Sequence, residues 1–224
     1  MTIHGVDFWS PVRLSLQISF VSSIIVLILG TLLAFWMARR SFHGKVWVET
    51  LFMLPLVLPP TVVGFILLVM LGRKSWTGQL IERLFATPVI FTWSAGVIAS
   101  VVVAFPLVYQ TMKNAFASVD ESLEEAARSA GASEWQVFRY VTLPLCARSL
   151  MTAYILGIAR ALGEFGATLM IAGNIPGKTQ TVPTAIYVAV DTGNYTLAWA
   201  WTGVIVLISF LLLLLTGNKT KKNL

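Results

Sequence analysis

Two residues able to do chemistry lie inside an otherwise apolar stretch of the chain. Arg160 and Glu164 interrupt the run from Arg148 to about Ala172 and are four residues apart. At about 100° per residue, this spacing puts both side chains on one face of a helix. Charges inside a membrane span cost ~2.5–3.5 kcal/mol each on insertion scales, so they indicate pairing or function. Two interpretations stay open. Either the Arg–Glu pair joins this helix to its neighbours, or Arg160 adds positive potential near an anion pathway while Glu164 limits how tightly Arg160 binds the anion.

A second apolar run, Thr50–Gly72, contains three prolines, Pro55, Pro59 and Pro60. Prolines inside a span remove backbone donors and kink the helix, so the freed carbonyls must face protein or water. The pattern predicts either a fixed structural bend or a gate or pathway wall. In the second interpretation, Pro59, Pro60 and Thr61 form that wall.

The loop between the third and fourth apolar runs is the most informative polar stretch. Ser118 or Asp120 is suited to cap a first short helix, and Gly131 is suited to end it. Ser133 and Gln136 then form a capping-box pattern for a second short helix. The loop is either a connector on the membrane surface or a docking element for a cytoplasmic partner.

Residue constellations for catalysis or metal binding are missing from the sequence. Cys146 is the single cysteine, and the two histidines, His4 and His43, are far apart. No Walker-type phosphate loop and no nucleophile–base arrangement within the spans is present. We therefore expect a chain that is not an enzyme and that binds no cofactor or metal itself.

Composition places the chain in a membrane. Of its 224 residues, 57% are hydrophobic and 12% charged, against ~45–50% and ~25% in soluble proteins. Five runs reach the ~20 residues that a membrane-spanning helix needs. They are Leu14–Ala38, Thr50–Gly72, Val89–Met112, Arg148–Ala172 and Thr192–Gly217. We expect an all-α membrane protein with about five transmembrane helices, forming a single domain over residues 1–224.

The distribution of basic residues predicts the orientation. Ten of the sixteen Lys and Arg residues fall on one side of this topology, five on the other, and Arg160 lies within a span. The ten are Arg39, Arg40, Lys45, Lys113, Arg128, Arg139, Arg148, Lys219, Lys221 and Lys222. Positive-inside bias then puts the N-terminus outside and the C-terminus in the cytoplasm. The net charge of +6 reflects this topology rather than binding to nucleic acid.

The polar loop also carries a spaced motif. It reads Glu125-Ala126-Ala127, three residues, Gly131, nine residues, Val141, one residue, and Leu143-Pro144. This resembles the EAA loop of bacterial ABC-importer permeases, with Val141 replacing the isoleucine of that motif. In that family the loop forms coupling helices that dock on the ATP-binding subunit. The resemblance implies a coupling role for Glu124, Glu125, Ala126, Ala127, Gly131, Ala132, Val141, Leu143 and Pro144.

Four further segments, 9–16, 54–64, 159–167 and 176–181, resemble the molybdate-type permeases of this family. Sulfate and thiosulfate permeases share the segment 160–166, so those oxyanions remain the alternative to molybdate or tungstate. A stand-alone secondary transporter or channel would explain the spans but not the spaced loop motif.

The resemblance implies the type I ABC-importer fold, in the inner membrane of a bacterium, working by alternating access. It also implies a set of partners. They are a second copy of the chain, two ABC ATPase subunits that hold ATP and Mg²⁺, and an extracytoplasmic oxyanion-binding protein. Five spans make a thin wall for a pathway, which two copies around a shared axis would enclose.

Overall fold

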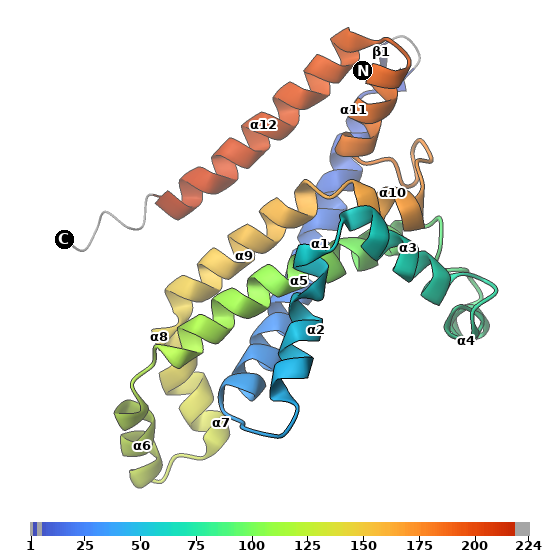
Figure 1. Ribbon diagram of the computed structural model, residues 1–224. Helices are drawn as coiled ribbons and strands as arrows, with labels where there is room; N and C mark the ends of the chain where they lie inside the picture. Colours follow the sequence, from blue (N-terminus) through green and yellow to red (C-terminus); the bar gives the residue numbers. More distant parts are fainter. Residues whose placement is uncertain (1, 4–5, 218–224) are drawn as a thin grey trace.

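Helices dominate the computed structural model, which describes residues 2–3 and 6–217 (Figure 1). The long helices are α1 (Trp9–Ala38), α5 (Trp93–Ala117), α9 (Ala147–Leu162) and α12 (Tyr195–Gly217). Helices of intermediate length are α2 (Lys45–Val57), α3 (Pro60–Leu71), α4 (Trp76–Phe85), α6 (Glu121–Ser129) and α11 (Val182–Asp191). The short ones are α7 (Glu134–Val137), the π-helical turn η1 (Phe138–Thr142), α8 (Leu143–Leu145) and α10 (Gly166–Ala172). Two-residue strands, β1 (Thr2–Ile3) and β2 (Val6–Asp7), pair near the N-terminus. The all-α expectation is confirmed apart from this small pair.

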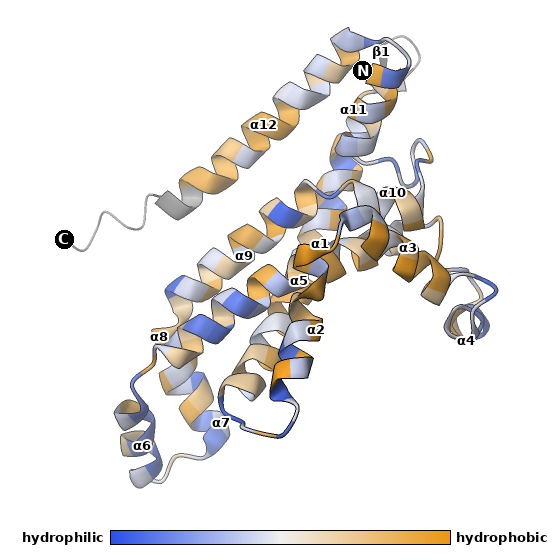
Figure 2. Ribbon diagram, in the orientation of Figure 1, coloured by the Kyte–Doolittle hydropathy of each residue, from blue (hydrophilic) through white to orange (hydrophobic). Residues whose placement is uncertain are grey.

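Within the described residues, α1, α5 and α12 are long and apolar enough to cross a membrane as single helices. Two bent pairs raise the total to five if each counts as one span. One is α2 with α3, bent by 115°, and the other is the segment Glu134–Leu145 with α9, bent by 73°. The expected number of five spans is therefore reached only if each bent pair counts as one span. Three of the basic residues used to predict the orientation, Lys219, Lys221 and Lys222, lie outside the described residues. Figure 2 shows hydrophilic residues gathered on α6 and α7, and hydrophobic ones along α3 and much of α12.

The break in the second span follows from consecutive prolines. A residue before proline is pushed to extended backbone, and Leu58 and Pro59 both adopt it, with ψ of 142° and 135°. Pro60 then occupies the first turn of α3, where its missing N–H costs nothing. The predicted kink is confirmed, and it is sharp enough to divide the run into two helices.

The fourth predicted span is also divided, which corrects the expectation of one helix from Arg148 to Ala172. Helix α9 ends at Leu162, and the chain leaves helical geometry before α10 begins at Gly166. Glu164 lies in this break and not on the face of a continuous helix. The apolar composition of the segment hid the interruption, because residues 161–172 contain no proline.

The centre of the fold is the packing of α1 against α5 and α9 (Figure 1). Small residues allow the close approach that membrane helices use in place of a hydrophobic driving force. A Cβ added at Gly30 of α1 would lie 2.9 Å from Val108 Cγ1, and one at Gly157 of α9 would lie 3.1 Å from Val108 Cγ2. Val108 of α5 is thus held between two glycines, and this contact sets the spacing of the three helices.

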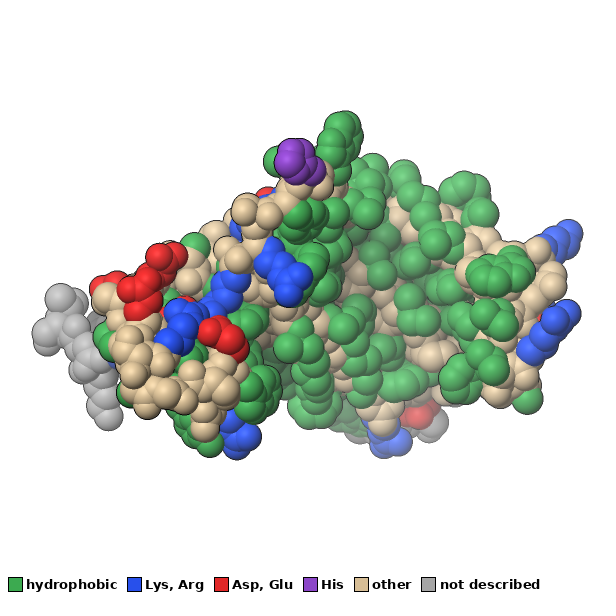
Figure 3. All heavy atoms as spheres, turned by 90° about the horizontal axis from the view of Figure 1, so that it is seen from below, with side chains coloured by type: hydrophobic (Ala, Val, Ile, Leu, Met, Phe, Trp, Pro, Cys, Tyr) green, Lys and Arg blue, Asp and Glu red, His purple; other side chains and the backbone are tan. Residues whose placement is uncertain are grey.

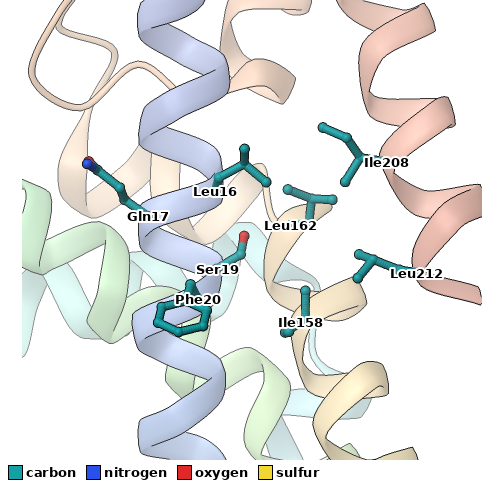
Figure 4. Close-up of a pocket in the computed structure, with 8 residues that line it drawn as sticks. All are labelled: Leu16, Gln17, Ser19, Phe20, Ile158, Leu162, Ile208 and Leu212. Carbon is teal, nitrogen blue, oxygen red and sulfur yellow. The ribbon is translucent and has the colours of Figure 1, made fainter. Parts of the chain in front are cut away.

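Helix α12 packs along α11 and stands apart from much of α9 (Figure 1). Its N-terminal part is fixed, because Trp201 Nε1 donates to the Phe8 carbonyl at 3.0 Å and the two rings stack. Farther along, a groove of about 420 Å³ separates it from α1 and α9. Figure 4 shows the lining residues, Leu16, Gln17, Ser19, Phe20, Ile158, Leu162, Ile208 and Leu212.

Helix α3, from the second predicted span, and helix α10, from the fourth, cross at very short range. A Cβ added at Gly64 would lie 2.7 Å from both Ala167 Cα and Met170 Cβ. One added at Gly166 would lie 3.1 Å from Pro60 Cβ and 3.1 Å from the Thr61 backbone nitrogen. This crossing brings the two breaks together.

We expect Gly64→Ala to destabilise the protein by about 1–3 kcal/mol, because the added methyl overpacks a backbone contact. Its apparent melting temperature in detergent should fall. Gly203→Ala is the matched control, since a Cβ at Gly203 of α12 meets nothing within 4 Å. Equal melting temperatures for the two variants would contradict the close crossing.

Candidate functional site

The polar loop forms two short helices at one end of the molecule, where charged side chains gather at the left of Figure 3. Of the two capping candidates, Asp120 makes the bond, accepting from the Ser122 backbone N–H at 2.9 Å. That hydrogen bond lowers the pKa of the Asp120 carboxyl. Gly131 has φ of +90°, which turns the chain after α6. Ser133 and Gln136 form the reciprocal capping box that the sequence predicts for α7.

The residues of the EAA motif differ in accessibility. Glu125, Ala126, Gly131 and Pro144 are exposed, whereas Ala127, Ala132, Val141 and Leu143 are half-buried. Glu124 is buried, with 7% of its surface exposed. Its carboxylate therefore faces the protein rather than a partner.

Glu124 joins the loop to the end of α1. The Arg39 guanidinium donates to Glu124 Oε1, and the Thr142 hydroxyl donates to the same oxygen at 2.5 Å. Arg39 also donates to Thr142 at 3.3 Å and lies over the Phe35 ring, 4.3 Å from its centroid. The sequence assigned Arg39 only a topological role, because nothing in its spacing connects it to a residue 85 positions later.

Arg128 extends this network to α7. Its Nη2 donates to Glu124 Oε2 at 3.4 Å, and its Nε donates to Glu134 Oε1 at 2.6 Å. The hydrogen bond from Arg128 lowers the pKa of the Glu134 carboxyl, and the Arg39 charge acts in the same direction. The coupling network of Arg39, Glu124, Arg128, Glu134 and Thr142 thus links α1, α6, α7 and η1.

The other predicted site residues meet at the two span breaks. Arg160 Nη1 donates to Glu164 Oε2 at 2.9 Å, so the pair forms although α9 has ended. Glu164 Oε1 accepts the Ala167 backbone N–H at 2.8 Å, in the first turn of α10. Glu164 is only 2% exposed, whereas the Arg160 side chain is 29% exposed. The carboxylate is therefore a buried structural acceptor, and the cation is partly accessible.

Pro59, Pro60 and Thr61 lie at the same junction. Gly166, two residues after Glu164, contacts Pro60 and Thr61 at the distances given above. Pro59, Pro60 and Thr61, which the sequence suggested as a pathway wall, are all exposed on the surface of this chain. Five hydroxyl side chains, Ser15, Ser19, Ser100, Thr168 and Thr181, surround Glu164 together with Ile18, Ala161 and Leu162, and the gap between them is too small to hold a water molecule. Residues 6–217 hold no group of three or more His, Cys, Asp or Glu side chains placed to bind a metal.

With this arrangement established, comparison with known proteins assigns the chain to a class. Residues 19–219 match the family described as binding-protein-dependent transport system inner membrane component. The chain belongs to this family. It is an inner-membrane transport component and not an enzyme.

Particular relatives extend over nearly the whole chain. YvgM of Bacillus subtilis (strain 168), which carries a provisional name as a molybdenum transport system permease protein, is 60% identical over 218 residues, covering 97% of this chain and 96% of YvgM. The molybdenum transport system permease protein ModB of Escherichia coli (strain K12) is 41% identical over 184 residues, covering 82% and 80%. A protein of Chlorella vulgaris named for sulfate transport, cysT, is 35% identical over 206 residues, covering 92% and 77%.

Solved structures share the fold. A bacterial alginate ABC transporter in complex with an alginate pentasaccharide-bound periplasmic protein aligns with a TM-score of 0.76 at 16% identity, covering 95% of this chain and 78% of the other. The MetNI methionine ABC transporter in inward-facing conformations aligns with a TM-score of 0.70 at 18% identity, covering 94% of both chains. The expected type I importer permease fold is confirmed.

We expect Arg39→Gln to destabilise the protein by about 1–3 kcal/mol, because it leaves buried Glu124 without its nearest cation. The apparent melting temperature in detergent measures this. Arg40→Gln is the matched control, since Arg40 is exposed and its guanidinium lies over Trp36 near the end of α1. A melting temperature that falls equally for both variants would argue against the coupling network.

The two residues of the Arg160–Glu164 pair should respond unequally. Arg160→Gln strands an almost fully buried carboxylate, at a cost of roughly 3–5 kcal/mol. Glu164→Gln retains an acceptor for the Ala167 N–H and leaves a cation that solvent reaches, so we expect a smaller loss. The double variant should recover stability relative to Arg160→Gln, and a cycle of melting temperatures measures the coupling. If the stability losses of the two single variants simply add in the double variant, the coupling energy between Arg160 and Glu164 is zero.

Proposed function

We propose that this chain is the permease subunit of an ATP-driven importer of molybdate, with tungstate as a second substrate. The observation that carries the proposal is that permeases named for molybdenum are more similar in sequence to this chain than one named for sulfate. Identity is 60% and 41% to permeases named for molybdenum and 35% to one named for sulfate. Sulfate or thiosulfate import is the second candidate, supported by that 35% relative.

The exposed residues of the EAA loop are the proposed docking surface for the ATPase. Glu125 and Ala126 lie on the open side of α6, and Gly131 turns the chain toward α7. The coupling network holds this surface to α1, so a displacement of the loop would move the end of a membrane-spanning helix. Glu124 has a different proposed role, as the internal anchor of the loop.

A second copy of the chain, two ATPase subunits and an extracytoplasmic binding protein complete the proposed complex. Helix α2 has no buried residue, and Trp47, Leu51 and Val57 on it are exposed hydrophobics. Such a surface suits contact with a second copy or with lipid. The proposed orientation has the EAA loop and the C-terminus in the cytoplasm and the N-terminus outside, as the positive-inside bias favours.

The junction of the two broken spans is the proposed pathway wall. Non-helical backbone at membrane depth is tolerated where it is buried in protein or lines an aqueous cavity. Pro59, Pro60 and Thr61 are exposed there, and Arg160 adds positive potential that the paired Glu164 moderates. A moderated cation would attract a dianion without holding it tightly, which favours release.

Uptake by the reconstituted complex tests the substrate. Vesicles containing the permease, its ATPase and its binding protein should accumulate labelled molybdate when ATP is supplied. Excess unlabelled tungstate should compete, and excess sulfate should leave uptake nearly unchanged. Competition by sulfate as strong as that by molybdate would overturn the molybdate assignment.

Removal of the segment from Glu125 to Gly131 tests the ATPase-docking role. We expect the ATPase to be lost from the purified complex, because the proposed contact surface is gone. The matched variant Ala126→Arg, which keeps the helix and its anchor, should weaken the association without lowering the melting temperature of the permease. Retained ATPase and undiminished transport in both variants would favour a stand-alone carrier.

A further inference from the structure

Helix α4 is a short amphipathic helix whose role the importer function leaves unassigned. Its sequence, Trp76 to Phe85, carries apolar side chains over one broad side and Gln79, Glu82 and Arg83 along the other edge. Amphipathic helices with aromatic and leucine residues on one face and charges on the other lie in membrane interfaces.

The chain fixes α4 against the end of α3. A Cβ added at Gly78 would lie 2.2 Å from the Gly72 carbonyl oxygen, so the two backbones are in direct contact. Ser75 donates to the Met70 and Gly72 carbonyls at 2.5 and 2.7 Å, and Thr77 also donates to Met70. These bonds satisfy carbonyls at the open end of α3 and set the direction of α4.

Nothing among the described residues covers the opposite side of α4. Trp76, Leu80 and Leu84 recur every four residues and are 78%, 44% and 70% exposed. Phe85 follows Leu84 at the end of α4, about 100° further around the helix, and is 71% exposed. We call Trp76, Leu80, Leu84 and Phe85 the α4 stripe.

The position of α4 along the chain places the α4 stripe at a membrane boundary. Helix α5 is a single 25-residue span, with α4 shortly before its start and the EAA loop directly after its end. Helix α4 therefore lies at the boundary opposite to the EAA loop. In Figure 1 α4 projects sideways from the bundle, and Figure 3 shows hydrophobic side chains over this region with Lys and Arg at its rim.

The charges beside α4 indicate which surface covers the stripe. Arg73 and Lys74 precede the helix and Arg83 lies on it, against a single acidic residue, Glu82. Arg73 is 3.8 Å from Glu82, and both side chains remain solvent-accessible. Three cations against one anion beside an exposed apolar stripe match anionic headgroups above acyl chains. We propose that α4 is an interfacial anchor, with the α4 stripe in the headgroup–acyl boundary of the leaflet opposite to the EAA loop and the cations on anionic phospholipid.

Site-directed spin labelling of the permease–ATPase complex tests this anchor, whatever anion is transported. The buried Cys146 is replaced by alanine, and single cysteines at Leu80, Leu84 or, as the matched control on the polar edge, Gln79 carry the label. Vesicles contain phosphatidylcholine with or without phosphatidylglycerol. Collision with oxygen, which partitions into lipid, is compared with collision with a water-soluble nickel chelate.

We expect labels at L80C and L84C to favour oxygen over nickel several-fold more than the label at Q79C, and phosphatidylglycerol to increase this difference. Equal ratios on both faces would overturn the proposal. So would stripe labels shielded from both reagents, spin–spin broadening between two copies, or shielding that appears only when the binding protein is added. An oxygen preference that does not respond to phosphatidylglycerol would overturn the choice of anionic headgroups.

Discussion

A helix that breaks within a membrane must find partners for its freed backbone groups inside the protein, because lipid offers none. The second predicted span is broken between α2 and α3, the fourth is broken between α9 and α10, and the fold is built around that requirement. Glu164 accepts the Ala167 N–H at the start of α10, while Pro60 begins α3 without any N–H to satisfy. Gly64 and Gly166 then let the two broken spans meet backbone to backbone. The proposed pathway wall is a consequence of this solution, since the irregular backbone is gathered at one place.

A buried glutamate paired with an arginine occurs both at the α9–α10 joint and at the other end of the molecule. Glu124 and Glu164 are both buried carboxylates, and each is paired with an arginine that remains partly exposed. A buried ion pair adds little net stability but makes the loss of either partner costly, so it fixes geometry more than it adds free energy. One pair fixes the EAA loop to α1, and the other fixes the joint between α9 and α10. Both pairs lie in regions through which the proposed importer would transmit movement.

The sequence predicted what depends on local pattern. Three of the five spans, the Asp120 cap, the Gly131 turn and the Ser133–Gln136 capping box all rest on neighbouring residues, and the structure has them. The prolines at 59 and 60 predicted the first break. The break at Gly163–Phe165 could not be foreseen, because it is stabilised by packing of Gly166 on Pro60 and Thr61, about a hundred residues away in sequence. The link from Arg39 to Glu124 escaped prediction for the same reason, and Glu124 was grouped with the docking residues because its burial is a tertiary property.

The bond between Trp201 and Phe8 has a consequence for biosynthesis. Its donor and acceptor are 193 residues apart in the chain. At ~5–20 residues per second, the ribosome needs roughly 10–40 s to supply Trp201 after Phe8 has emerged. Throughout that time the N-terminal end of α1 lacks the stacking and hydrogen-bonding surface of α12. The N-terminal helix must therefore be held by the insertion machinery, or by α5 and α9 as they arrive, and its contact with α12 forms last.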